Sequence, residues 1–467
     1  MKQLNVGLLG IGTVGGGTYT VLTRNAAEIT RRTGVAINVM QVADRNLDHA
    51  KTITGGKVDV TNDAFAVVNN PNVDVVVELI GGYTLSKELV LKAIENGKHV
   101  VTANKALLAT HGNEIFTAAQ AKGVIVAYEA AVAGGIPIIK ALREGLGANQ
   151  IEWVAGIING TTNFILTEMR EKGLAFADVL SEAQRLGYAE ADPTFDVEGI
   201  DAAHKLTIMS AIAFGMPMKF DQAYTEGITK LQQTDIKYAE ELGYRVKLLG
   251  ITKRTFAGVE LRVHPTLISE KRLVANVNGA MNAVVVKGDA VGPTLYYGAG
   301  AGAEPTASSV VADLMDVARM TNASIEQRVP YLGFQAGQLN DLPILPISEI
   351  NSAYYLRLRV SDKPGVLAGV TKILADRNIS IDAMLQKEPD DNETEADIVI
   401  LTHITVEKNM DSGIAEIEAL PAIVGKVVKL RMEELGKSFS SVTLGYLIMK
   451  YISTRGQSPI MPSVPLL

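Results

Sequence analysis

The residues best suited to chemistry lie at positions 187–205, the densest polar stretch of the chain. Asp201 and Lys205 are four positions apart, so on a helix they share one face. Such a pair is most often a solvent-exposed ion pair, but residues 206–214 are too apolar for an exposed helix. We therefore expect a partly buried and paired Lys205, and burial can tune a lysine to exchange protons near neutral pH.

A glycine-rich turn near the N-terminus predicts dinucleotide binding. Gly10, Gly12 and Gly15 form a G-x-G-x-x-G pattern, with Thr13 and Val14 inside it, where a strand pattern gives way to a helix pattern. The first glycine permits a tight turn, the second lets the backbone approach a pyrophosphate, and the third allows close helix–strand packing. The helix N-terminus offers N–H groups to the phosphates. The alternative is a glycine turn of an ordinary α/β protein.

The end of the second predicted strand carries Asp44 and Arg45. An acid here favours the 2′-hydroxyl of the NAD ribose, whereas an arginine favours the 2′-phosphate of NADP. Arg45 could instead be a solvated loop residue. Because both residues are present, the choice between NAD and NADP stays open.

The absence of cysteine narrows the possible reactions. It excludes disulfides, thiolate metal sites and the oxidation of an aldehyde through a thiohemiacetal. Interconversion of an alcohol and a carbonyl remains, and it needs hydride transfer from the cofactor plus one residue that moves a proton. His, Lys and Tyr are candidates for that residue. The six histidines show no metal-ligand spacing, so we expect no zinc site.

Composition indicates a soluble, cytoplasmic protein of several domains. The chain has 467 residues and a net charge of −7, which suggests about three domains and no general attraction to nucleic acid or anionic membranes. No apolar run reaches the ~20 residues of a membrane span, and the N-terminus lacks a signal-peptide pattern. The missing cysteines fit a reducing compartment.

The elements that position these residues begin with a parallel sheet covered on both faces. β-branched runs alternating with helical periodicity are typical of such a sheet. We expect strands at residues 4–9, 35–43, 73–80, 99–102 and 124–128, and helices from the glycine turn to about residue 32, at 85–96 and at 113–122.

After about residue 137 the pattern predicts an inserted α+β domain. It combines a helix near 137–144, a strand at 151–158, helices at 162–172, 176–185 and 199–214, and antiparallel strands at 245–252, 258–264 and 273–277. A second glycine-rich turn, 298–302, precedes a helix at 305–321 that we expect to rejoin the first domain. Residues 322–352 contain several prolines and read as a linker.

Residues 354–432 follow a β-α-β-β-α-β order, which predicts a ferredoxin-like unit. We therefore divide the chain into a Rossmann-type domain of residues 1–136 and 303–322, an inserted domain of 137–302, a linker of 323–352, a ferredoxin-like domain of 353–435, and a tail of 436–467.

Together these segments resemble homoserine dehydrogenase over roughly residues 1–435. The most specific strings lie between positions 105 and 205 and end in the family's Asp-x-x-Gly-x-Asp-x-x-x-Lys pattern, here Asp196, Gly199, Asp201 and Lys205. The resemblance implies NAD(P)-dependent interconversion of L-aspartate 4-semialdehyde and L-homoserine, in the biosynthesis of threonine, methionine and isoleucine. It also implies a homodimer or homotetramer.

The resemblance implies roles for individual residues. Lys205 would donate a proton to the aldehyde oxygen during reduction and remove it in reverse, since a cationic lysine stabilises a developing alkoxide. Glu190 and Asp201 would hold the substrate, partly through its ammonium group, and Lys105 would lie near substrate and cofactor. The implied cofactor contacts are Gly10, Gly12, Thr13, Val14, Gly15, Arg45, Lys105, Gly187 and Gly302.

Carried over from the family, a monovalent cation, typically sodium, would bind the Glu129 carboxylate and the backbone carbonyls of Val132, Gly134 and Ile136. A carboxylate with free carbonyls in a glycine-rich turn suits a hard cation. The alternative for Glu129 is a hydrogen-bonded buried polar group.

The last unit resembles an ACT domain through residues 362–367, which include Asp362, Gly365 and Val366. N–H groups at the helix start could bind an amino-acid carboxylate, and threonine is the effector that the family resemblance implies. A dimerisation module without a ligand is the alternative.

Past about residue 435 the match ends, and residues 449–459 resemble the start of threonine synthase. We hypothesise that this tail arises from an in-frame join or readthrough, and that it is dispensable. Truncation at Lys437 that abolished folding or activity would contradict this idea.

Two other functions remain open. A nucleotide-sensing regulator would keep the cofactor and ACT domains without turnover, and the intact set of Glu190, Asp201 and Lys205 argues against it. Another ACT-bearing dehydrogenase, such as a hydroxyacid enzyme, would use a histidine–glutamate pair instead of Lys205.

Overall fold

A parallel sheet forms the N-terminal part of the protein. The computed structural model describes residues 2–387 and 394–435, so the predicted tail lies outside the described residues. The sheet has the order β3-β2-β1-β4-β5-β6, which is the strand order of a doubly wound dinucleotide-binding fold. Its strands are β1 (Lys2–Leu9), β2 (Val35–Ala43), β3 (Asp59–Thr61), β4 (Val75–Glu78), β5 (His99–Thr102) and β6 (Val126–Ala127).

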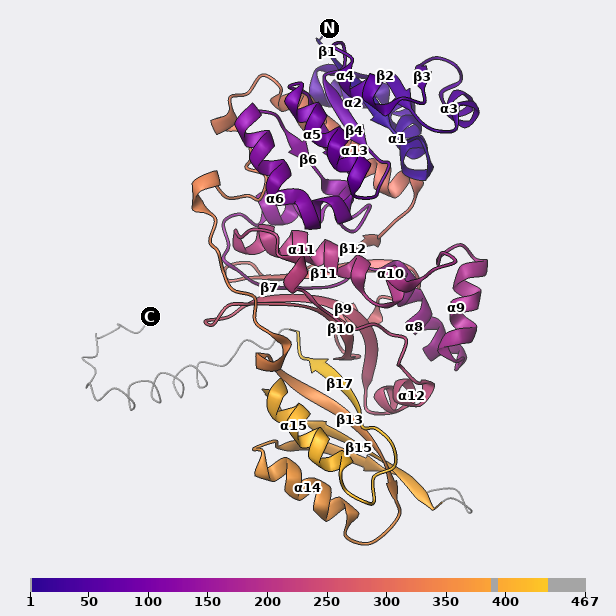
Figure 1. Ribbon diagram of the computed structural model, residues 1–467, viewed down its shortest axis with the longest axis vertical. Coiled ribbons are helices and arrows are strands. Elements are labelled where there is room, and N and C mark those ends of the chain that lie inside the picture. The colour runs from indigo at the N-terminus through magenta and orange to yellow at the C-terminus, as the bar shows by residue number, and fades with distance from the viewer. Residues whose placement is uncertain (1, 388–393, 436–467) are drawn as a thin grey trace, which may run out of the picture. The chain divides into compact units, whose positions relative to one another are not determined.

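Helices cover this sheet, and one of them comes from far along the chain (Figure 1). Val6 and Leu8 of β1 share an apolar core with Val310 and Leu314 of α13. The helix after the second glycine-rich turn therefore does rejoin the first domain. The helices are α1 (Thr13–Arg24), α2 (Ala26–Thr33), α3 (Leu47–Thr54), α4 (Ala64–Asn69), α5 (Thr84–Glu95), α6 (Lys105–Lys122) and α13 (Ala303–Met320).

Two predicted helix limits in this domain are wrong. The helix expected to run to residue 32 is broken at Asn25, whose backbone is not helical, and continues as α2. Helix α6 begins at Lys105 and not at residue 113, because the Asn104 side chain caps it by accepting from Leu107 N at 3.1 Å. Gly112 lies inside α6, where a Cβ atom would meet Met218 Sδ at 2.8 Å. A side chain at this position would therefore require Met218 to shift.

The inserted domain is built on an antiparallel sheet with the order β12-β11-β7-β9-β10. Helix α11 packs against α6 and against β7, β9 and β10, so it lies between the two sheets. The strands are β7 (Ile151–Ile157), β9 (Tyr244–Arg254), β10 (Val259–Ser269), β11 (Met281–Gly288) and β12 (Gly292–Ala299), with α7 (Ile138–Lys140), α8 (Gly160–Lys172), α9 (Phe176–Arg185), α10 (Thr194–Val197), α11 (Ile200–Phe214) and α12 (Gln233–Glu241).

The strand predicted at 273–277 is wrong. This segment is a 3-10 turn, Leu273–Asn276, because its N–H groups bond locally, as Ala275 N does to Arg272 O at 3.1 Å. The sheet continues instead through β11 and β12. Strand β12 was not predicted from the sequence. Its residues alternate between exposed and half-buried, with Leu295 and Tyr297 exposed, so it lacks the buried apolar run by which other strands were predicted.

The ferredoxin-like unit has the predicted β-α-β-β-α-β order and the strand order β17-β13-β15-β14. Strand β17 also pairs in parallel with β10, with Arg431 opposite Thr266, so one sheet runs through both units. That junction was not predicted. The elements are β13 (Asn351–Ser361), α14 (Val366–Asp376), β14 (Ile381–Gln386), β15 (Glu395–Thr402), α15 (Glu407–Glu418) and β17 (Val428–Glu433), with the short strands β8 (Tyr224–Thr225) on β10 and β16 (Thr405–Val406) on β13.

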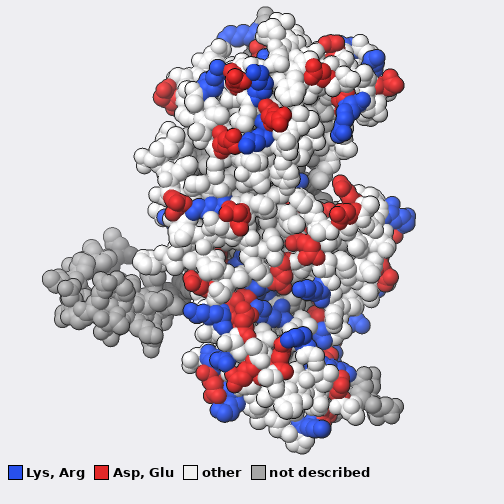
Figure 2. Space-filling model, viewed as in Figure 1, with Lys and Arg blue, Asp and Glu red and all other residues white. Residues whose placement is uncertain are grey.

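Acidic and basic side chains are interspersed on the face of the molecule shown in Figure 2. Among the described residues, no helix is both long enough and apolar enough to cross a membrane.

Candidate active site

A buried lysine–aspartate pair lies in the first two turns of α11. Lys205 Nζ donates to Asp201 Oδ2 at 2.7 Å and to the backbone carbonyl of Ile158 at 2.7 Å. Asp201 is 4% exposed and Lys205 is 9% exposed. The helix starts at Gly199, whose φ of 80° lies in the left-handed region that glycine adopts without strain. The expected pairing on one helix face is therefore present and buried.

A second lysine reaches the same carboxylate from the other domain. Lys105 Nζ lies 3.1 Å from Asp201 Oδ1. Lys105 is the first residue of α6, and the capping residue Asn104 is itself fixed by donating to Gly82 O at 2.8 Å. Asp201 thus carries one ammonium group on each oxygen, and these groups come from two domains.

Burial and charge act in opposite directions on these groups. Burial alone would raise the pKa of Asp201, but Lys205 and Lys105 hold it well below its usual value. The pKa of Lys105 is raised, chiefly by Asp201. Burial lowers the pKa of Lys205, and Lys105 adds to this while Asp201 opposes it. Of the two lysines, Lys205 is therefore the one that releases its proton more readily, which suits a proton-transfer role.

Asn159, which the sequence did not single out, bonds to two carboxylates of the site. Its Nδ2 donates to Asp196 Oδ1 at 2.7 Å and to Asp201 Oδ2 at 2.8 Å. Burial and the charge of Asp201 raise the pKa of Asp196. A sequence signal existed only in part: asparagine is a common helix cap, and Asn159 caps α8 by accepting from Thr162 N at 2.8 Å.

His204 is fully buried beside Lys205, and neither ring nitrogen has a hydrogen-bond partner among the described residues. Its ring lies 4.2 Å from that of Phe220 and 5.2 Å from that of Phe195, measured between centroids. Burial lowers its pKa to about 4. At neutral pH the imidazole is uncharged and adds no positive charge to the site.

Two residues predicted for the site lie on an exposed loop after α9. Glu190 is exposed, and its carboxylate makes no hydrogen bond or ion pair within the described part of the chain. Its backbone carbonyl accepts from Gln184 Nε2 at 3.0 Å. Gly187 is also exposed, with φ 79°. The structure does not bring either residue into contact with Lys205.

The glycine turn has the geometry that each glycine predicts. Gly10 has φ 88°. Around Gly12, which caps α1, a Cβ atom would have no neighbour within 4 Å, whereas at Gly15 it would meet Gly10 O at 2.1 Å. The second glycine therefore faces open space for a pyrophosphate, and the third allows α1 to touch the turn. Thr13 and Val14 begin α1, and Gly302 caps α13.

Asp44 and Arg45 differ in their surroundings. Asp44 Oδ2 accepts from Ile11 N at 2.8 Å and Oδ1 accepts from Asn46 N at 2.8 Å, so this carboxylate braces the glycine turn. Arg45 is exposed, and its guanidinium has no hydrogen bond or ion pair to any described residue.

The Glu129 carboxylate is 1% exposed and accepts from Ile139 N at 2.9 Å and from Lys140 N at 2.8 Å. Burial and the charge of Asp313 raise its pKa to about 7, and burial raises the pKa of Asp313 to about 6. Lys140 lies 3.6 Å from Asp313 and 2.5 Å from Asp316, so one ammonium serves several acids. Lys140 acts against both shifts and Arg143 acts against that of Asp313, yet both pKa values stay raised.

The turn after Glu129 is strained. Ala133 and Gly134 have φ of 56° and 49°, and a positive φ is unfavourable for alanine. The carbonyls of Gly134 and Ile136 each accept one hydrogen bond, from Ser309 Oγ at 2.6 Å and Ile138 N at 2.8 Å, which leaves a second lone pair on each oxygen. The residues therefore fit a hard cation held by oxygen atoms.

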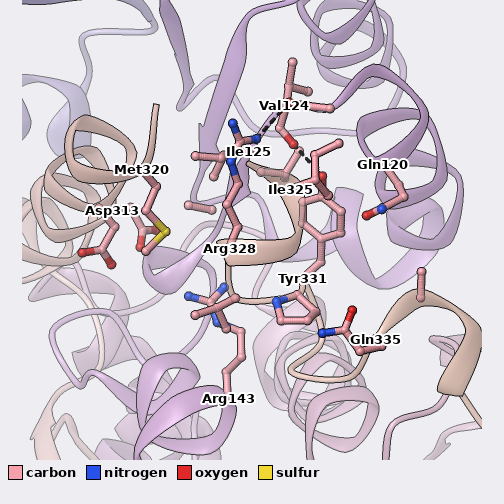
Figure 3. Close-up of a pocket in the computed structure, with 17 residues that line it drawn as sticks. Gln120, Val124, Ile125, Arg143, Asp313, Met320, Ile325, Arg328, Tyr331 and Gln335 are labelled. Carbon is pink, nitrogen blue, oxygen red and sulfur yellow. Dashed lines mark hydrogen bonds between the residues drawn. The ribbon is translucent and has the colours of Figure 1, made fainter. Parts of the chain in front are cut away.

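Figure 3 shows a pocket between β6, α13 and the linker, lined by Arg143, Asp313, Arg328 and Tyr331 among others. Arg328 Nη1 donates to Gly123 O at 2.9 Å and Tyr331 Oη donates to Val124 O at 2.5 Å. These bonds fasten the linker to the first domain. Lys105, Asp201 and Lys205 are not among the residues that line this pocket.

The start of α14 is open to solvent. Asp362 and Gly365 are exposed, Val366 is half-buried, and Gly365 caps the helix with φ 90°. The backbone N–H of Asp362 already donates a hydrogen bond to Thr394 O at 3.0 Å.

A doubly wound dinucleotide-binding fold that carries a buried lysine–aspartate pair, in a chain without cysteine, fits the class of nicotinamide-dependent oxidoreductases. Family models match in three stretches: the homoserine dehydrogenase NAD-binding domain at residues 10–129, homoserine dehydrogenase at 137–315 and the ACT domain at 354–422. The chain belongs to the homoserine dehydrogenase family.

Relatives of known identity agree with this assignment. A homoserine dehydrogenase of Pseudomonas aeruginosa is 63% identical over 435 residues, which are 93% of this chain and 100% of that protein. The crystal structure of a homoserine dehydrogenase from Thiobacillus denitrificans has 67% identity and a TM-score of 0.89, over 93% of this chain and 99% of that one. A hyperthermophilic archaeal homoserine dehydrogenase in complex with NADPH has 26% identity and a TM-score of 0.59, over 69% and 99%.

Proposed function

We propose that the chain interconverts L-aspartate 4-semialdehyde and L-homoserine, with Lys205 moving the proton. The observation that carries this proposal is the Lys205 ammonium, held by Asp201 Oδ2 and the Ile158 carbonyl at 2.7 Å each. A nicotinamide cofactor supplies or accepts the hydride. The pathway role in threonine, methionine and isoleucine biosynthesis follows from the same proposal.

In reduction, protonated Lys205 donates to the aldehyde oxygen as negative charge develops there. In oxidation, neutral Lys205 accepts the hydroxyl proton of homoserine, so the rate rises with pH through the pKa of Lys205. Asp201 would hold the Lys205 ammonium in position, and Lys105, paired with the other carboxylate oxygen, would add a second positive charge to the site.

For substrate binding we propose Glu190 and Asp201, whose carboxylates suit the substrate ammonium group. The exposed, unpaired Glu190 supports this role, because its carboxylate has no partner among the described residues that a substrate would have to displace.

For the cofactor we propose NADP in preference to NAD. The Asp44 oxygens already brace the turn, while exposed Arg45 is available for a 2′-phosphate. The relative bound to NADPH supports the same choice. Gly187, Gly302 and Lys105 remain proposed contacts. Replacing Arg45 with alanine should raise KM for NADP about tenfold and leave KM for NAD within about twofold, as measured by initial rates.

We also propose that sodium binds at Glu129 with the carbonyls of Val132, Gly134 and Ile136. The raised pKa values of the buried Glu129 and Asp313 carboxyls, which Lys140 and Arg143 do not cancel, support it. The cation would hold the buried turn in place. Thermal unfolding should occur at higher temperature in sodium chloride than in choline chloride of equal ionic strength, and equal midpoints would contradict the site.

For the ACT domain we propose threonine as an inhibitory effector at residues 362–366, where the open start of α14 can bind a carboxylate. We also propose that the protein is a homodimer or homotetramer and that it is cytoplasmic. For the domains we propose the limits 1–136 with 303–322, 137–302, 323–352 and 353–435. Adding threonine to the assay below tests the regulation.

Absorbance at the nicotinamide band, with homoserine and either NAD or NADP, tests the activity. Lys205→Ala should lower turnover by roughly three orders of magnitude or more while cofactor still binds. The matched control is Lys172→Ala, because this lysine lies on the surface of α8 with 55% of its side chain exposed. No cofactor reduction by the unaltered protein under any condition would remove the proposed activity.

A further inference from the structure

Asn159 uses every polar atom of its side chain at the site. Nδ2 donates to Asp196 Oδ1 at 2.7 Å and to Asp201 Oδ2 at 2.8 Å. Oδ1 accepts from Thr162 N at 2.8 Å and from Thr162 Oγ1 at 2.9 Å. The side chain is 5% exposed, so an amide that is itself fixed by α8 holds two carboxylates.

These bonds oppose a repulsion. Asp196 and Asp201 are like charges that share one amide, and buried like charges favour protonation of one of the two. Asp201 Oδ2 is also the oxygen that accepts from Lys205 Nζ at 2.7 Å. Lys205 is bonded in addition to the carbonyl of Ile158, the residue next to Asn159. One short segment at the end of β7 therefore contacts both members of the ion pair.

We propose that Asn159 is a positioning residue for proton transfer: its amide keeps the Asp201 carboxylate oriented toward Lys205 and keeps the neighbouring Asp196 carboxylate ionised. This inference rests on the proposed function of Lys205. It assigns to Asn159 no contact with substrate or cofactor.

The charged and titratable groups that face Lys205 are Asp201, Lys105, Asp196 and His204. Without the amide, Asp196 takes up a proton more readily, because burial and Asp201 already raise its pKa, whereas Lys205 and Lys105 keep Asp201 ionised. The negative charge that acts on Lys205 then weakens. Lys205 then loses its proton more readily. The acid limb of the homoserine oxidation profile should therefore move to lower pH.

Two substitutions separate this role from helix capping. Asn159→Ser keeps a good cap for α8 but has no group that reaches two carboxylates, whereas Asn159→Ala removes both functions. Both variants should lower kcat for homoserine oxidation about tenfold and move the acid limb down by about one pH unit. KM for the cofactor should stay unchanged. Asp63→Ala, which removes the cap of α4 at a distance from the site, is the control for cap loss.

NMR of lysine labelled with ¹³C at Cε provides a readout without turnover, with Lys205 assigned from Lys205→Arg. The Lys205 titration should move down by about one unit in Asn159→Ser. If Asn159→Ser keeps both the wild-type profile and the wild-type titration, the proposal is overturned and capping is the whole role of Asn159. If the unaltered protein fails to oxidise homoserine, the proposed function falls, and the NMR titration still decides whether Asn159 controls Lys205.

Discussion

At the scale of single residues, one carboxylate organises the site. Asp201 accepts from Lys205 and Asn159 on one oxygen and pairs with Lys105 on the other. A buried charge with several donors stays ionised because each donor offsets part of the lost hydration. The reactivity of Lys205 is therefore set by its neighbours as much as by its own burial.

Replacing Asp201 with asparagine should expose that dependence. Lys205 and Lys105 would lose their shared counter-ion, and the pKa of Lys205 would fall further because only Asp196 would still oppose burial and Lys105. We expect turnover to drop by roughly two orders of magnitude or more and the acid limb of homoserine oxidation to move to lower pH. Initial rates across pH measure both effects. The exposed Asp221→Asn is the control, and an unchanged profile in Asp201→Asn would contradict the shared role.

A second buried lysine has no acidic partner in its hydrogen bonds. Lys247 is 2% exposed and donates to Val277 O at 2.6 Å and to Asn163 Oδ1 at 3.1 Å. Burial, with help from Arg170 and Arg245, lowers its pKa from 10.5 to about 7. Between these two values the unfolded chain holds a proton that the folded chain lacks, so stability rises with pH in this window.

That rise should disappear in Lys247→Met, which keeps a long side chain without a charge. For the unaltered protein, the contribution is up to about 1.4 kcal/mol per pH unit above pH 7. Urea unfolding of both proteins at pH 7, 8 and 9 measures the difference in free energy of unfolding between them. If that difference is independent of pH, Lys247 is charged in the folded protein and this prediction is wrong.

At the scale of elements, the starts of two helices place the two lysines. Asn104 caps α6 immediately before Lys105, and the left-handed Gly199 starts α11 so that Asp201 falls in its first turn. A Cβ atom at Gly199 would lie 3.0 Å from Val263 Cγ1 of β10, so this glycine also permits close packing.

The linker is a third positioned element, since its Tyr331 ring stacks on Phe116 with centroids 5.2 Å apart.

The linker should detach if Tyr331 is shortened. Tyr331→Ala removes the stacking and the bond to Val124 O, and should cost about 3–5 kcal/mol of stability and speed proteolysis between residues 321 and 350. Tyr331→Phe removes only the hydroxyl and should cost about 1 kcal/mol. Thermal unfolding and limited proteolysis check both. Tyr297→Ala, at a side chain with 59% exposure, is the control, and equal proteolysis of all variants would show that the contact does not hold the linker.

At the scale of the whole molecule, the ACT unit is continuous with the inserted domain. Besides the β10–β17 pairing, Arg431 donates to Glu407 Oε1 at 2.5 Å and to Glu226 Oε2 at 2.7 Å. Arg431 and Glu407 are 2% and 1% exposed. Glu226 belongs to the segment after β8, whose next residues contact the turn that leads into α11, as Ile228 N does by donating to Val197 O at 2.9 Å. A physical connection thus runs from the ACT unit to α11, the helix that carries Asp201 and Lys205.

Breaking this connection should weaken the contact between the ACT unit and the inserted domain. Arg431→Met leaves Glu407 buried with Lys429 as its remaining cation, and should cost about 3–5 kcal/mol. Calorimetry should show an earlier transition for the ACT unit. The surface pair Lys372–Asp376 is the comparison, because Lys372→Met should cost less than about 1 kcal/mol. Equal losses in the two variants would mean that the buried network does not join the units.

Prediction from sequence succeeded where a pattern is local. The glycine turn and the spacing of Asp201 and Lys205 follow from fixed turn and helix geometry, and both appear as expected. Leu273–Asn276 failed as a strand because a short apolar run fits a 3-10 turn equally well. The predicted helix of residues 113–122 lacks the first eight residues of α6 (Lys105–Lys122), whose start is fixed by the cap at Asn104.

The amino-acid order alone therefore predicted the class of fold, because helical and strand periodicities are short-range. The family resemblance came from the motifs between positions 105 and 205, and it agreed with Lys205 as the residue proposed for proton transfer. Only the folded structure showed that Lys105 and Lys205 share the Asp201 carboxylate, that Asn159 joins it to Asp196, and that β17 extends the sheet of β10. The physical reason is that these contacts join segments far apart in the chain. Packing decides such contacts, and no local spacing encodes them.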